Sequence, residues 1–445
     1  MTIDTVDLTV DGIAVGGAGI GRTETGRVVF VPGTAPGDRV KAVLTEQRKR
    51  WARGRVVEVY ERGPDRVDPA CPHFGTCGGC RLMHLNDVAQ GEALRQGVAD
   101  TLARIGGVTL PVPPIVAGTH RLGYRNRVSF TVRRRGGRVF AGYHAERGRR
   151  LVEIEACPLA EPGIARAWRD LRSAWGTGAR HLPPGGELRL TLRTNREGDV
   201  ALLVTGGRDT TGASPAAAAR SREGAKIIAD ETGGLTSYWW APADGPRRHL
   251  FGRETLPDVW NAIELDLLPQ AFLQVNREIA GAIEDHLDEG LEPIAGRRVL
   301  DLYAGVGLRA IRWARAGARV VAVEANPDAV ATGRKAARSG EGRQNVGEPE
   351  YVESTVEAAL PGLDAEIVIV NPPRAGLSEA VIECLCASKA ERLVYVSCDP
   401  GTLARDVARL AVAWAPTRAQ PFDAFPHTGH VETVVWFERR SGTST

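Results

Sequence analysis

The sequence is poor in lysine and cysteine, and it contains no apolar run long enough to span a membrane. Its first residues also lack a signal-peptide pattern, so we expect a cytoplasmic protein without a membrane partner. Seven cysteines in a protein of that compartment indicate metal-binding or catalytic thiols rather than disulfides. Only five of the 57 basic residues are lysine, so arginine supplies almost all of the positive charge.

A length of 445 residues exceeds that of one ordinary domain, and we expect two or three domains. The apolar fraction of 43% and the charged fraction of 25% are typical of a soluble globular protein. The sequence shows no internal repeat of the solenoid type.

Arginine is concentrated in two stretches, although the net charge is only +3. Between Arg121 and Arg150 there are ten arginines and a single acid, Glu146. A second cluster, residues 48–55, surrounds Trp51 with five cations. Guanidinium groups at this density suit a phosphate backbone, and an aromatic ring among them can stack on a base. The alternative is a solvated surface in an arginine-rich proteome; we favour contact with nucleic acid.

Short strands separated by glycine turns make up the sequence as far as Glu61. Turns at Gly16-Gly17, Pro32-Gly33 and Pro36-Gly37 interrupt segments in which apolar residues alternate with polar ones. This pattern predicts a small β-barrel, with strands at residues 5–10, 26–31, 39–44 and 54–60.

The following region is less regular and predicts a domain of mixed strands and helices. We expect a linker at residues 64–69, a helix near residues 88–105, and strands at residues 188–192 and 199–205. Residues 210–224 are rich in Ala, Ser and Gly, which predicts a flexible loop.

A cysteine-rich segment lies within this region. Cys71, Cys77 and Cys80 have the spacing C-x5-C-x2-C, and Cys157 far downstream can act as a fourth thiolate. Four cysteines suit either an iron–sulfur cluster or a zinc ion. Zinc ligands usually come in closely spaced pairs, which only Cys77 and Cys80 form. The C-x3-C-x2-C spacing of radical S-adenosylmethionine enzymes is absent.

Strands and helices alternate regularly from about residue 270 onward, which predicts a doubly wound parallel sheet. Cys384 and Cys386 fall on a helix of this domain and are expected to be core residues. The expected strands are residues 299–303, 320–324, 366–370 and 393–397.

The run at residues 299–307 has the pattern of a strand that enters a glycine turn and then a helix. Gly305 and Gly307 allow the backbone to approach a ligand, and Glu324 ends the next strand nineteen residues after Gly305. An acid at that distance can accept hydrogen bonds from a ribose diol. Because a third glycine is missing and Asn371-Pro-Pro-Arg374 follows a later strand, we favour S-adenosylmethionine over NAD. The alternative is that the two glycines serve only the packing of a helix on a strand.

A nucleophile and a base accompany this cofactor pattern. Cys398 closes an expected buried strand, and Pro400-Gly401 turns the chain into a helix near residues 402–410. Residues just beyond the carboxyl ends of such strands line the ligand crevice of open α/β sheets, where a thiol can be activated as a thiolate. Alone, Cys398 would be a structural cysteine and Glu432 a surface acid. Together, beside a methyl-donor fold, they indicate a nucleophile and a general base.

These motifs together resemble the TrmA/RumA family of uracil-C5 RNA methyltransferases over nearly the whole length. The N-terminal barrel is similar to the TRAM domain that many members carry for RNA binding. The pieces that carry the resemblance are Phe272-Leu-Gln-Val-Asn276, Asp301-Leu-Tyr-Ala-Gly-Val-Gly307, Asn371-Pro-Pro-Arg-Ala-Gly376, Ser397-Cys-Asp-Pro400 and His427-Thr-Gly-His-Val-Glu432.

The resemblance implies an α/β multidomain fold in three parts. Residues 1–62 would form an OB-like TRAM barrel that binds RNA. Residues 63–270 would form an α+β central domain with the iron–sulfur segment and an arginine-rich RNA-contact region. Residues 271–445 would form a doubly wound, Rossmann-like S-adenosylmethionine-dependent methyltransferase domain.

The resemblance also implies a role for each site residue. Cys398 would be the nucleophile and Glu432 the base, while the methyl donor would contact Gln274, Tyr303, Glu324 and Asn371 beside the glycine turn. Family members with this cysteine spacing hold a [4Fe–4S] cluster, which favours such a cluster over zinc on Cys71, Cys77, Cys80 and Cys157.

The implied product is 5-methyluridine in structured RNA, formed through a covalent adduct between the cysteine and C6 of uracil. The cluster and the TRAM-like barrel favour 23S ribosomal RNA as the substrate, with transfer RNA as the alternative. We expect the protein to be a monomer.

Three residues depart from the family pattern. Asn371 stands where the family usually has Asp, Ala304 where a cysteine is frequent, and Leu308 where a small polar residue usually follows the second glycine. Two alternatives follow from these departures: an exocyclic-amine methyltransferase that uses Asn371-Pro-Pro, and an RNA-binding assembly factor that has lost catalysis. Both are weakened because Cys398 and Glu432 are present together.

Overall fold

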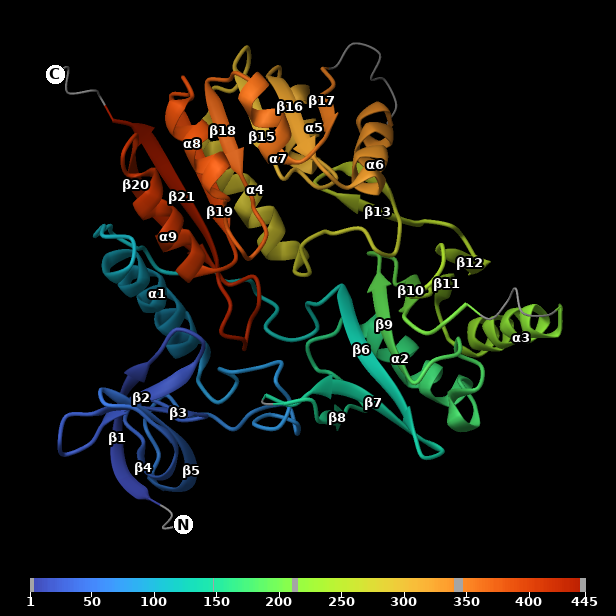
Figure 1. The fold of residues 1–445 in the computed structure, drawn as a ribbon, viewed down its shortest axis with the longest axis horizontal. Coiled ribbons are helices and arrows are strands. Elements are labelled where there is room, and N and C mark those ends of the chain that lie inside the picture. Colours follow the sequence, from blue (N-terminus) through green and yellow to red (C-terminus); the bar gives the residue numbers. More distant parts are fainter. Residues whose placement is uncertain (1–3, 147, 210–214, 340–346, 441–445) are drawn as a thin grey trace.

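The computed structural model describes residues 4–146, 148–209, 215–339 and 347–440. Figure 1 shows three units along the chain: a barrel at the N-terminus, a mixed sheet in the middle and a layered α/β unit at the C-terminus. This arrangement confirms the expected α/β multidomain fold class. Within the described ranges, no helix is both long and apolar enough to cross a membrane.

Five strands close into the N-terminal barrel in the order β1-β2-β3-β5-β4. Val29, Val31 and Val40 are fully buried in its interior. The sequence analysis missed β2 because its two glycines give it a weak strand signal. The strands are β1 (Thr5–Ile13), β2 (Ala18–Arg22), β3 (Val28–Pro32), β4 (Arg39–Gln47) and β5 (Trp51–Glu61).

The helix α1 (Asp87–Arg104) begins after a side-chain cap by Asn86. Leu94 and Val98 on its buried face pack in the same core as the helix α9 (Pro400–Leu410) and the C-terminal sheet. Because α1 packs on the C-terminal sheet, it belongs structurally to the C-terminal unit, although it follows the barrel in sequence. In Figure 1 it lies between the barrel and α9.

Seven strands form the central sheet, in the order β12-β11-β10-β9-β6-β7-β8. The helices α2 (Pro162–Ala174) and α3 (Pro215–Glu231) cover one face of this sheet. On that face Phe130 stacks on Trp168 with ring centroids 3.8 Å apart. The strands are β6 (Arg127–Arg135), β7 (Arg138–His144), β8 (Leu151–Glu153), β9 (Glu187–Thr194), β10 (Val200–Thr205), β11 (Leu235–Ala241) and β12 (Arg248–Gly252).

The prediction of a flexible loop at residues 210–224 is wrong from residue 215 onward, where α3 begins. Residues 210–214 lie outside the described residues. The alanines that suggested a loop are the strongest helix formers, and Ala225 and Ile228 farther along α3 are buried against the central sheet. Residues 219–223 are exposed or half-buried, so this part of the helix gave no periodic apolar signal.

Seven further strands form the C-terminal sheet, in the order β17-β16-β15-β18-β19-β21-β20. Neighbouring strands are parallel except β21, which runs antiparallel to both β19 and β20. The strands are β15 (Arg298–Leu302), β16 (Arg319–Glu324), β17 (Glu350–Glu353), β18 (Ile367–Val370), β19 (Arg392–Ser397), β20 (Trp414–Phe422) and β21 (Glu432–Arg439).

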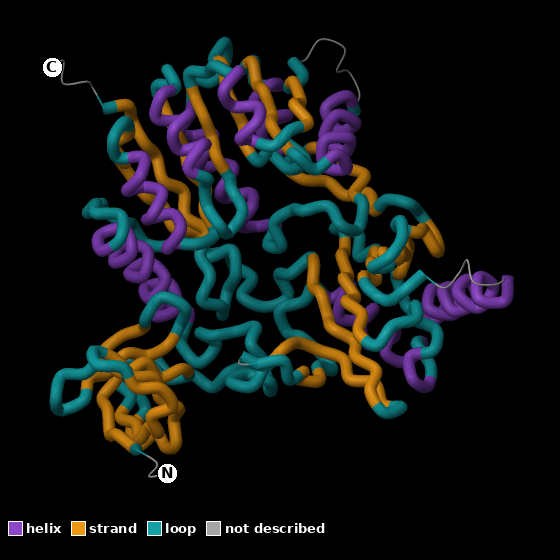
Figure 2. Tube along the Cα trace, in the orientation of Figure 1, coloured by secondary structure: helices purple, strands orange, loops and turns teal. Residues whose placement is uncertain are grey.

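Helices cover both faces of this sheet, as Figure 2 shows in purple. One core forms between the sheet and α1, α8 and α9, and a second forms between the sheet and α4, α5 and α6. Burial on both faces explains the continuous apolar strands that the sequence predicted. The remaining elements are β13 (Leu256–Trp260), β14 (Ile263–Leu267), α4 (Arg277–Leu291), α5 (Leu308–Arg315), α6 (Pro327–Arg338), α7 (Val356–Ala359) and α8 (Glu379–Ala387).

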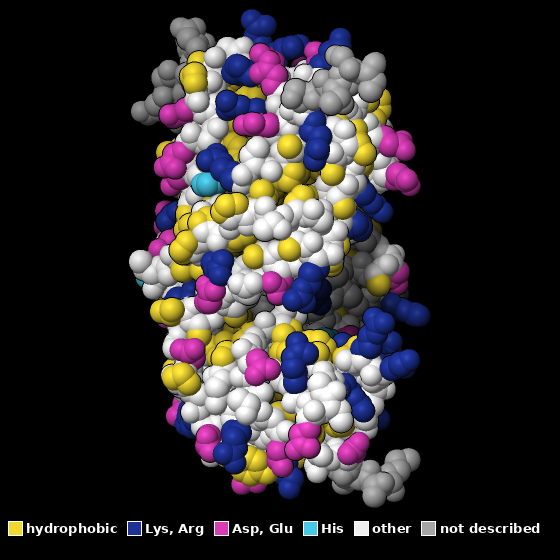
Figure 3. All heavy atoms as spheres, turned by 90° about the vertical axis from the view of Figure 1, so that its left-hand side faces the viewer, with side chains coloured by type: hydrophobic (Ala, Val, Ile, Leu, Met, Phe, Trp, Pro, Cys, Tyr) yellow, Lys and Arg dark blue, Asp and Glu magenta, His cyan; other side chains and the backbone are white. Residues whose placement is uncertain are grey.

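The face of the molecule that carries α1 and the barrel bears charges of both signs. Figure 3 shows Lys and Arg side chains interspersed with Asp and Glu, with apolar side chains between them. Exposed apolar residues include Val88 on α1 and Val412 after α9, with 82% and 80% of their surface accessible.

Candidate functional site

The glycine turn after β15 lies at the switch point of the C-terminal sheet. The chain leaves β15 toward β16 on one side and later enters β18 on the other, and ligands of such sheets bind at this crossover. Tyr303 and Gly305 have positive φ angles of 60° and 59°. A Cβ added to Gly305 would meet no atom within 4 Å, which leaves room for a ligand. Gly307 also allows close packing, because a Cβ added to it would lie 2.6 Å from the Tyr351 hydroxyl.

Glu324 ends β16 and holds this turn through its carboxylate. Its Oε2 accepts a hydrogen bond from the N–H of Gly305 at 2.9 Å, and its Oε1 accepts one from the N–H of Asn326 at 2.7 Å. A carboxylate has about four acceptor positions, so two remain for ribose hydroxyls. The geometry therefore suits the role that the sequence analysis gave to Glu324.

Asn371 follows β18 directly, and its backbone N–H donates to the end of β15 at 3.2 Å. Its half-buried side-chain amide has no hydrogen-bond partner in the described part of the chain, so its donors and acceptor are free for a ligand. Asp406 braces the loop that follows, because its carboxylate accepts from the N–H of Leu377 and the hydroxyl of Tyr395, both at 2.8 Å. The braced loop carries the exposed Arg374.

Cys398 and Glu432 lie opposite each other at the end of an antiparallel strand pair. Ser397, the last residue of β19, pairs with Thr433 on β21, so Cys398 and Glu432 occupy the next position of the register. The two side chains are close enough for the charge of Glu432 to act on the Cys398 thiol. The side chain of Asp399 caps α9 by accepting a backbone N–H of its first turn at 2.8 Å, which fixes the turn after Cys398.

The Glu432 carboxylate is buried, with 3% of the residue accessible. Gln274 donates a long hydrogen bond to its Oε1 (3.4 Å), and its Oε2 has no partner among the described residues. Burial raises the pKa of Glu432 to about 7, against the opposing effects of Gln274, Arg374 and Arg309. A carboxylate whose pKa lies near neutral pH suits general base catalysis.

Burial also raises the pKa of the Cys398 thiol, and the carboxylates of Glu432 and Asp399 raise it further. The positive charge of Arg374 lowers it and so favours the thiolate, the nucleophilic form. From the sequence, Arg374 was noted only as the end of the Asn371-Pro-Pro-Arg374 run, and this effect was not predicted. Its place in a polar run directly after a buried strand was the signal that could have identified it.

Gln274 lies on the segment between β14 and α4, which the central domain holds in place. Asn126, just before β6, donates its side-chain N–H to the Gln274 carbonyl and its backbone N–H to the Val275 carbonyl, both at 3.0 Å. The resemblance implied that Gln274 contacts the methyl donor, and the structure places its amide against the carboxylate of Glu432. The sequence offered no signal for Asn126.

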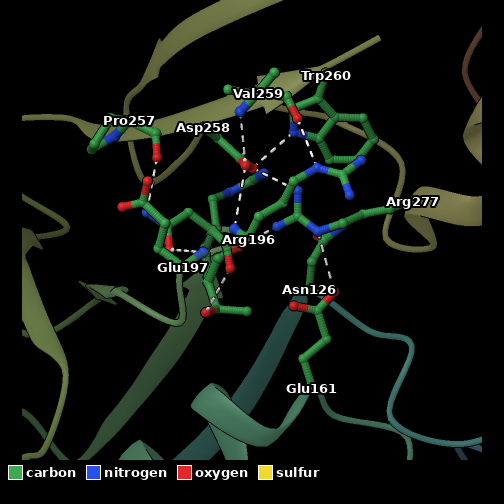
Figure 4. Close-up of polar contacts among 12 residues, drawn as sticks. Asn126, Glu161, Arg196, Glu197, Pro257, Asp258, Val259, Trp260 and Arg277 are labelled. Atoms are coloured by element: carbon green, nitrogen blue, oxygen red, sulfur yellow. Dashed lines mark hydrogen bonds and ion pairs between the residues drawn. The ribbon is translucent and has the colours of Figure 1, made fainter. Parts of the chain in front are cut away.

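Arg277, in the first turn of α4, fastens the same segment to the central domain (Figure 4). Its guanidinium donates to Asp258 at 2.6 Å and to Glu161 at 3.2 Å. It also donates to the Thr194 carbonyl at 2.6 Å and lies 4.9 Å from the centre of the Trp260 ring. These contacts fix the position of the Gln274 segment relative to the central sheet, because one rigid group joins elements of both units.

The four predicted metal ligands line a single cavity of about 330 Å³ in the central unit: Cys71, Cys77, Cys80 and Cys157. All four are free thiols. Burial raises the pKa of Cys80 to about 12, and the charge of Arg125 opposes this rise. The remaining predicted core cysteines, Cys384 and Cys386, pack against the core of the C-terminal unit.

Within the described ranges, no group of three or more His, Cys, Asp or Glu side chains is arranged to hold a metal ion. The donor set still suits thiolate ligation, because four free thiols share one cavity wall. Arg125 lies in the same wall and has no carboxylate partner in the described chain. An unneutralised cation suits a group of negative charge, such as an iron–sulfur cluster with four thiolate ligands.

Comparison with known proteins places this site in a family. A model of the tRNA (uracil-5-)-methyltransferase family matches residues 354–440, and a TRAM-domain model matches residues 1–57. The 23S rRNA (uracil(1939)-C(5))-methyltransferase RlmD of Halomonas elongata is 33% identical over 475 residues, which cover 99% of this chain and 92% of the relative. The chain belongs to the TrmA/RumA-type family of uracil-C5 RNA methyltransferases.

Other similar proteins cover nearly the whole chain. An uncharacterized RNA methyltransferase of Gloeobacter violaceus is 32% identical over 445 residues, which cover 98% of this chain and 96% of the relative. The tRNA (uracil-54, C5)-methyltransferase of Pyrococcus abyssi, solved in complex with S-adenosyl-L-homocysteine, has the same fold. It superposes with a TM-score of 0.69 at 23% identity and covers 97% of this chain and 100% of that chain.

Membership in the uracil-C5 RNA methyltransferase family confirms the enzyme class expected from the sequence, an S-adenosylmethionine-dependent RNA methyltransferase of class I. It also confirms the TRAM domain. The departure at Leu308 has a structural explanation, since this side chain packs against a core cluster that includes Trp260 and Ile311.

The raised pKa of Glu432 predicts a pH-dependent effect on stability. An acid with a pKa of about 7 in the fold and an ordinary value of 4.5 in water binds its proton more tightly when folded, so stability is lost as pH rises from 4.5 through 7. Glu432→Gln removes the charge. It should raise the free energy of unfolding at pH 8 by up to about 3 kcal/mol and have little effect at pH 5.

Thermal unfolding of both proteins at pH 5 and pH 8 measures this difference. Glu438→Gln, an exposed position near the other end of β21, is the matched control and should show no such pH dependence. An equal shift of the unfolding midpoint at both pH values would show that Glu432 is not buried in its charged form.

Proposed function

We propose that this chain transfers a methyl group to C5 of uracil in 23S ribosomal RNA through a covalent adduct between Cys398 and C6 of the base. The observation that carries this proposal is the strand register that sets Cys398 opposite the buried Glu432. The Halomonas elongata relative, named for a uracil of 23S ribosomal RNA, supports the substrate. Transfer RNA is the alternative that the name of the matching family suggests.

The two residues suffice for the covalent chemistry. C5 of uracil becomes nucleophilic when the Cys398 thiolate adds to C6, because the electron pair of the C5–C6 bond moves into an enolate. S-adenosylmethionine, when bound, supplies the electrophilic methyl group. C5 then holds both a methyl group and a proton. The Glu432 carboxylate removes this proton, the C5–C6 double bond forms again, and Cys398 leaves as a thiolate.

The residues around the switch point suit the methyl donor. The open space beside Gly305 leaves room for the methyl donor to approach the backbone of the turn. Glu324 offers acceptors for its ribose hydroxyls, and the free amide of Asn371 offers both a donor and an acceptor. The target base must leave its stack to reach Cys398, so an unpaired or flipped uridine is the substrate.

The central sheet offers a surface for the RNA backbone on the face opposite α2 and α3. These helices cover the side that carries Phe130, so Arg127 and Thr131 of the same strand point to the other side. The register pairs Arg127 with Arg193 and Thr131 with Arg189, which places all four side chains on that face.

Arg127 and Arg189 have no carboxylate partner in the described chain. Burial and the charge of Arg189 lower the pKa of Arg127, so an anion between them would relieve an existing repulsion. Ser129, whose hydroxyl is 2.8 Å from that of the buried Thr191, lies on the same face and can donate to a phosphate oxygen. Asn126, next to Arg127, holds the segment that carries Gln274, and Gln274 contacts Glu432. The arginine-bearing face of the central sheet therefore begins beside the proposed site.

Other arginines of the arginine-rich stretch serve protein contacts instead. Arg121 forms an ion pair with Asp423 at 2.5 Å, and Arg133 forms one with Glu187 at 2.7 Å. Arg134 donates to five backbone carbonyls between residues 178 and 185. Composition alone therefore overstates how many arginines are available to RNA.

We further propose that the four cysteines of the central cavity hold a [4Fe–4S] cluster, with a structural role. The spacing C-x5-C-x2-C and the unneutralised Arg125 in the cavity wall support the cluster. The cluster would lie beside residues 77–82, and the end of this segment contacts the loop before Glu432. The cluster would therefore help to hold the active site in place.

The covalent mechanism predicts opposite behaviour for the two catalytic variants. Cys398→Ala removes the nucleophile and should abolish both methylation and any covalent complex. Glu432→Gln should still allow methyl transfer, but the C5 proton stays in place and the protein remains attached to methylated RNA. Denaturing electrophoresis with labelled RNA measures the adduct, and Cys386→Ala serves as a control thiol. Normal turnover by Glu432→Gln, or methylation by Cys398→Ala, would refute the proposed roles.

The cluster proposal predicts about four irons and four sulfides per chain in protein purified without oxygen. Cys157→Ser should lower both contents, since it removes the one ligand that lies far from the others in sequence. Metal and sulfide analysis together with visible absorption measures the outcome. A colourless protein with one zinc per chain would contradict the proposal.

The RNA surface predicts a change in the salt dependence of binding. Arg127→Gln and Arg189→Gln should each weaken RNA binding and lower the slope of log affinity against log salt concentration by about one. Arg169→Gln, exposed on α2 behind the same sheet, is the matched control. Unchanged slopes for both variants in a filter-binding titration would remove this face from the RNA path.

A further inference from the structure

We infer that Gln90 on α1 is a positioning residue for the catalytic base: it fixes the loop that sets the place of Glu432. This inference rests on the proposed function of Glu432. The loop comprises residues 423–431, between β20 and β21, and we call it the base loop. In Figure 1 it descends in red beside the lower end of α1, toward the barrel.

The Gln90 amide is buried, with 1% of the residue accessible, and uses its whole hydrogen-bonding capacity. Its Nε2 donates to the Leu85 carbonyl at 2.8 Å and to Nδ1 of His427 at 3.1 Å. Its Oε1 accepts from the backbone N–H of His427 at 3.1 Å and from Arg121 at 3.4 Å. One side chain thus bonds both the backbone and the ring of the same base-loop residue, 337 positions away in sequence.

His427 needs such support because its backbone is in the left-handed region, with φ at 69°. A non-glycine residue in this region is strained and persists only where its surroundings hold it. Its carbonyl accepts the N–H groups of Arg81 and Leu82, both at 2.9 Å. Burial lowers the pKa of its ring to about 4, so at neutral pH Nδ1 is free to accept the hydrogen bond from Gln90.

Contacts on either side of His427 hold the rest of the base loop. The Tyr124 hydroxyl donates to the Pro426 carbonyl at 3.1 Å, and Arg121 pairs with Asp423 at the start of the loop. Gly429 lies so close to the barrel that an added Cβ would be 2.9 Å from backbone atoms of Gly16.

Ala424 and Val431 of the base loop pack in the cores of the C-terminal unit. The hydrogen bonds and close contacts described above come instead from residues that precede the C-terminal sheet in sequence: Gly16, Arg81, Leu82, Gln90, Arg121 and Tyr124. Glu432 is the first residue of the strand that follows the loop, and its carboxylate has only one long hydrogen bond of its own among the described residues. Its backbone pairs with Phe422, the last residue of β20, so both ends of the base loop enter the sheet at Glu432. The loop therefore bears directly on how this carboxylate is placed. A displacement of about 1 Å in a catalytic group can reduce its rate about a hundredfold.

Gln90→Leu tests this role, because leucine has a similar size but leaves the N–H and Nδ1 of His427 without partners. We expect the rate of RNA release from the adduct to fall about tenfold to a hundredfold, with KM for RNA unchanged. The covalent complex should accumulate, as proposed for Glu432→Gln. Gln96→Leu, on the exposed side of the same helix, is the matched control and should behave as the parent protein.

Gln90→Glu is the second variant, in case the leucine variant does not fold. It keeps an acceptor for the N–H of His427 but loses the donor to Nδ1, so its rate should lie between those of the parent and Gln90→Leu. A folded Gln90→Glu or Gln90→Leu protein that releases product at the parent rate would overturn the inference. Equal losses in RNA binding and turnover, without adduct, would also overturn it.

The proposed function has a separate test. If the parent protein methylates uracil but Glu432→Gln forms no adduct, the role of Glu432 fails whatever Gln90 does. If Glu432→Gln accumulates adduct and Gln90→Leu does not, only the inference on Gln90 fails.

Discussion

A carboxylate buried at the carboxyl edge of a parallel sheet is the constraint on which the rest of this molecule depends. Glu432 receives one long hydrogen bond from Gln274, and its second oxygen has no partner among the described residues. A pKa moved from 4.5 to about 7 means that ionisation in the fold costs about 3 kcal/mol more than in water. Any relaxation of the loop that let water reach the carboxylate would remove this difference. Glu432 therefore keeps a pKa near neutral pH only if the residues around it are held rigidly.

The residues that hold Glu432 in this way come from all three units of the chain. The central domain holds the Gln274 segment through Asn126 and Arg277, while α1 and the barrel hold the base loop. The proposed pair, Cys398 and Glu432, is thus surrounded by residues that lie hundreds of positions away in sequence. This dependence agrees with the extent of the similarity, since the relatives match 98% and 99% of the chain rather than the methyltransferase domain alone.

Four of the seven strands of the C-terminal sheet, β15, β16, β18 and β19, could be predicted closely because they are buried on both faces and therefore read as short apolar runs that end in polar residues. The strands β17, β20 and β21 were not predicted. The site residues that follow the four predicted strands were found by the same rule, and their roles remain predictions. Long-range partners such as Asn126 and Gln90 carry no local signal, because only the folded chain brings them to the site. Arg127 and Arg134 look alike in sequence. Arg127 is half-buried and has no carboxylate partner among the described residues, whereas Arg134 is surrounded by backbone carbonyls. The helix α3 was missed because alanine without visible periodicity resembles a loop.

The two cysteine environments show how one fold can treat the same side chain in two ways. Cys398 and Cys80 are both partly buried thiols with raised pKa values, and each has an arginine whose charge opposes the rise. Arg374, beside Cys398, is exposed and can respond to an incoming substrate, whereas Arg125 lies in a cavity wall lined by four thiols. An exposed arginine, such as Arg374, suits a thiolate that forms only when the substrate binds. A cysteine that was ionised permanently would be more easily oxidised. An arginine in the cavity wall, such as Arg125, suits thiolates that stay bound to a metal cluster, because a fixed cation offsets a fixed negative charge.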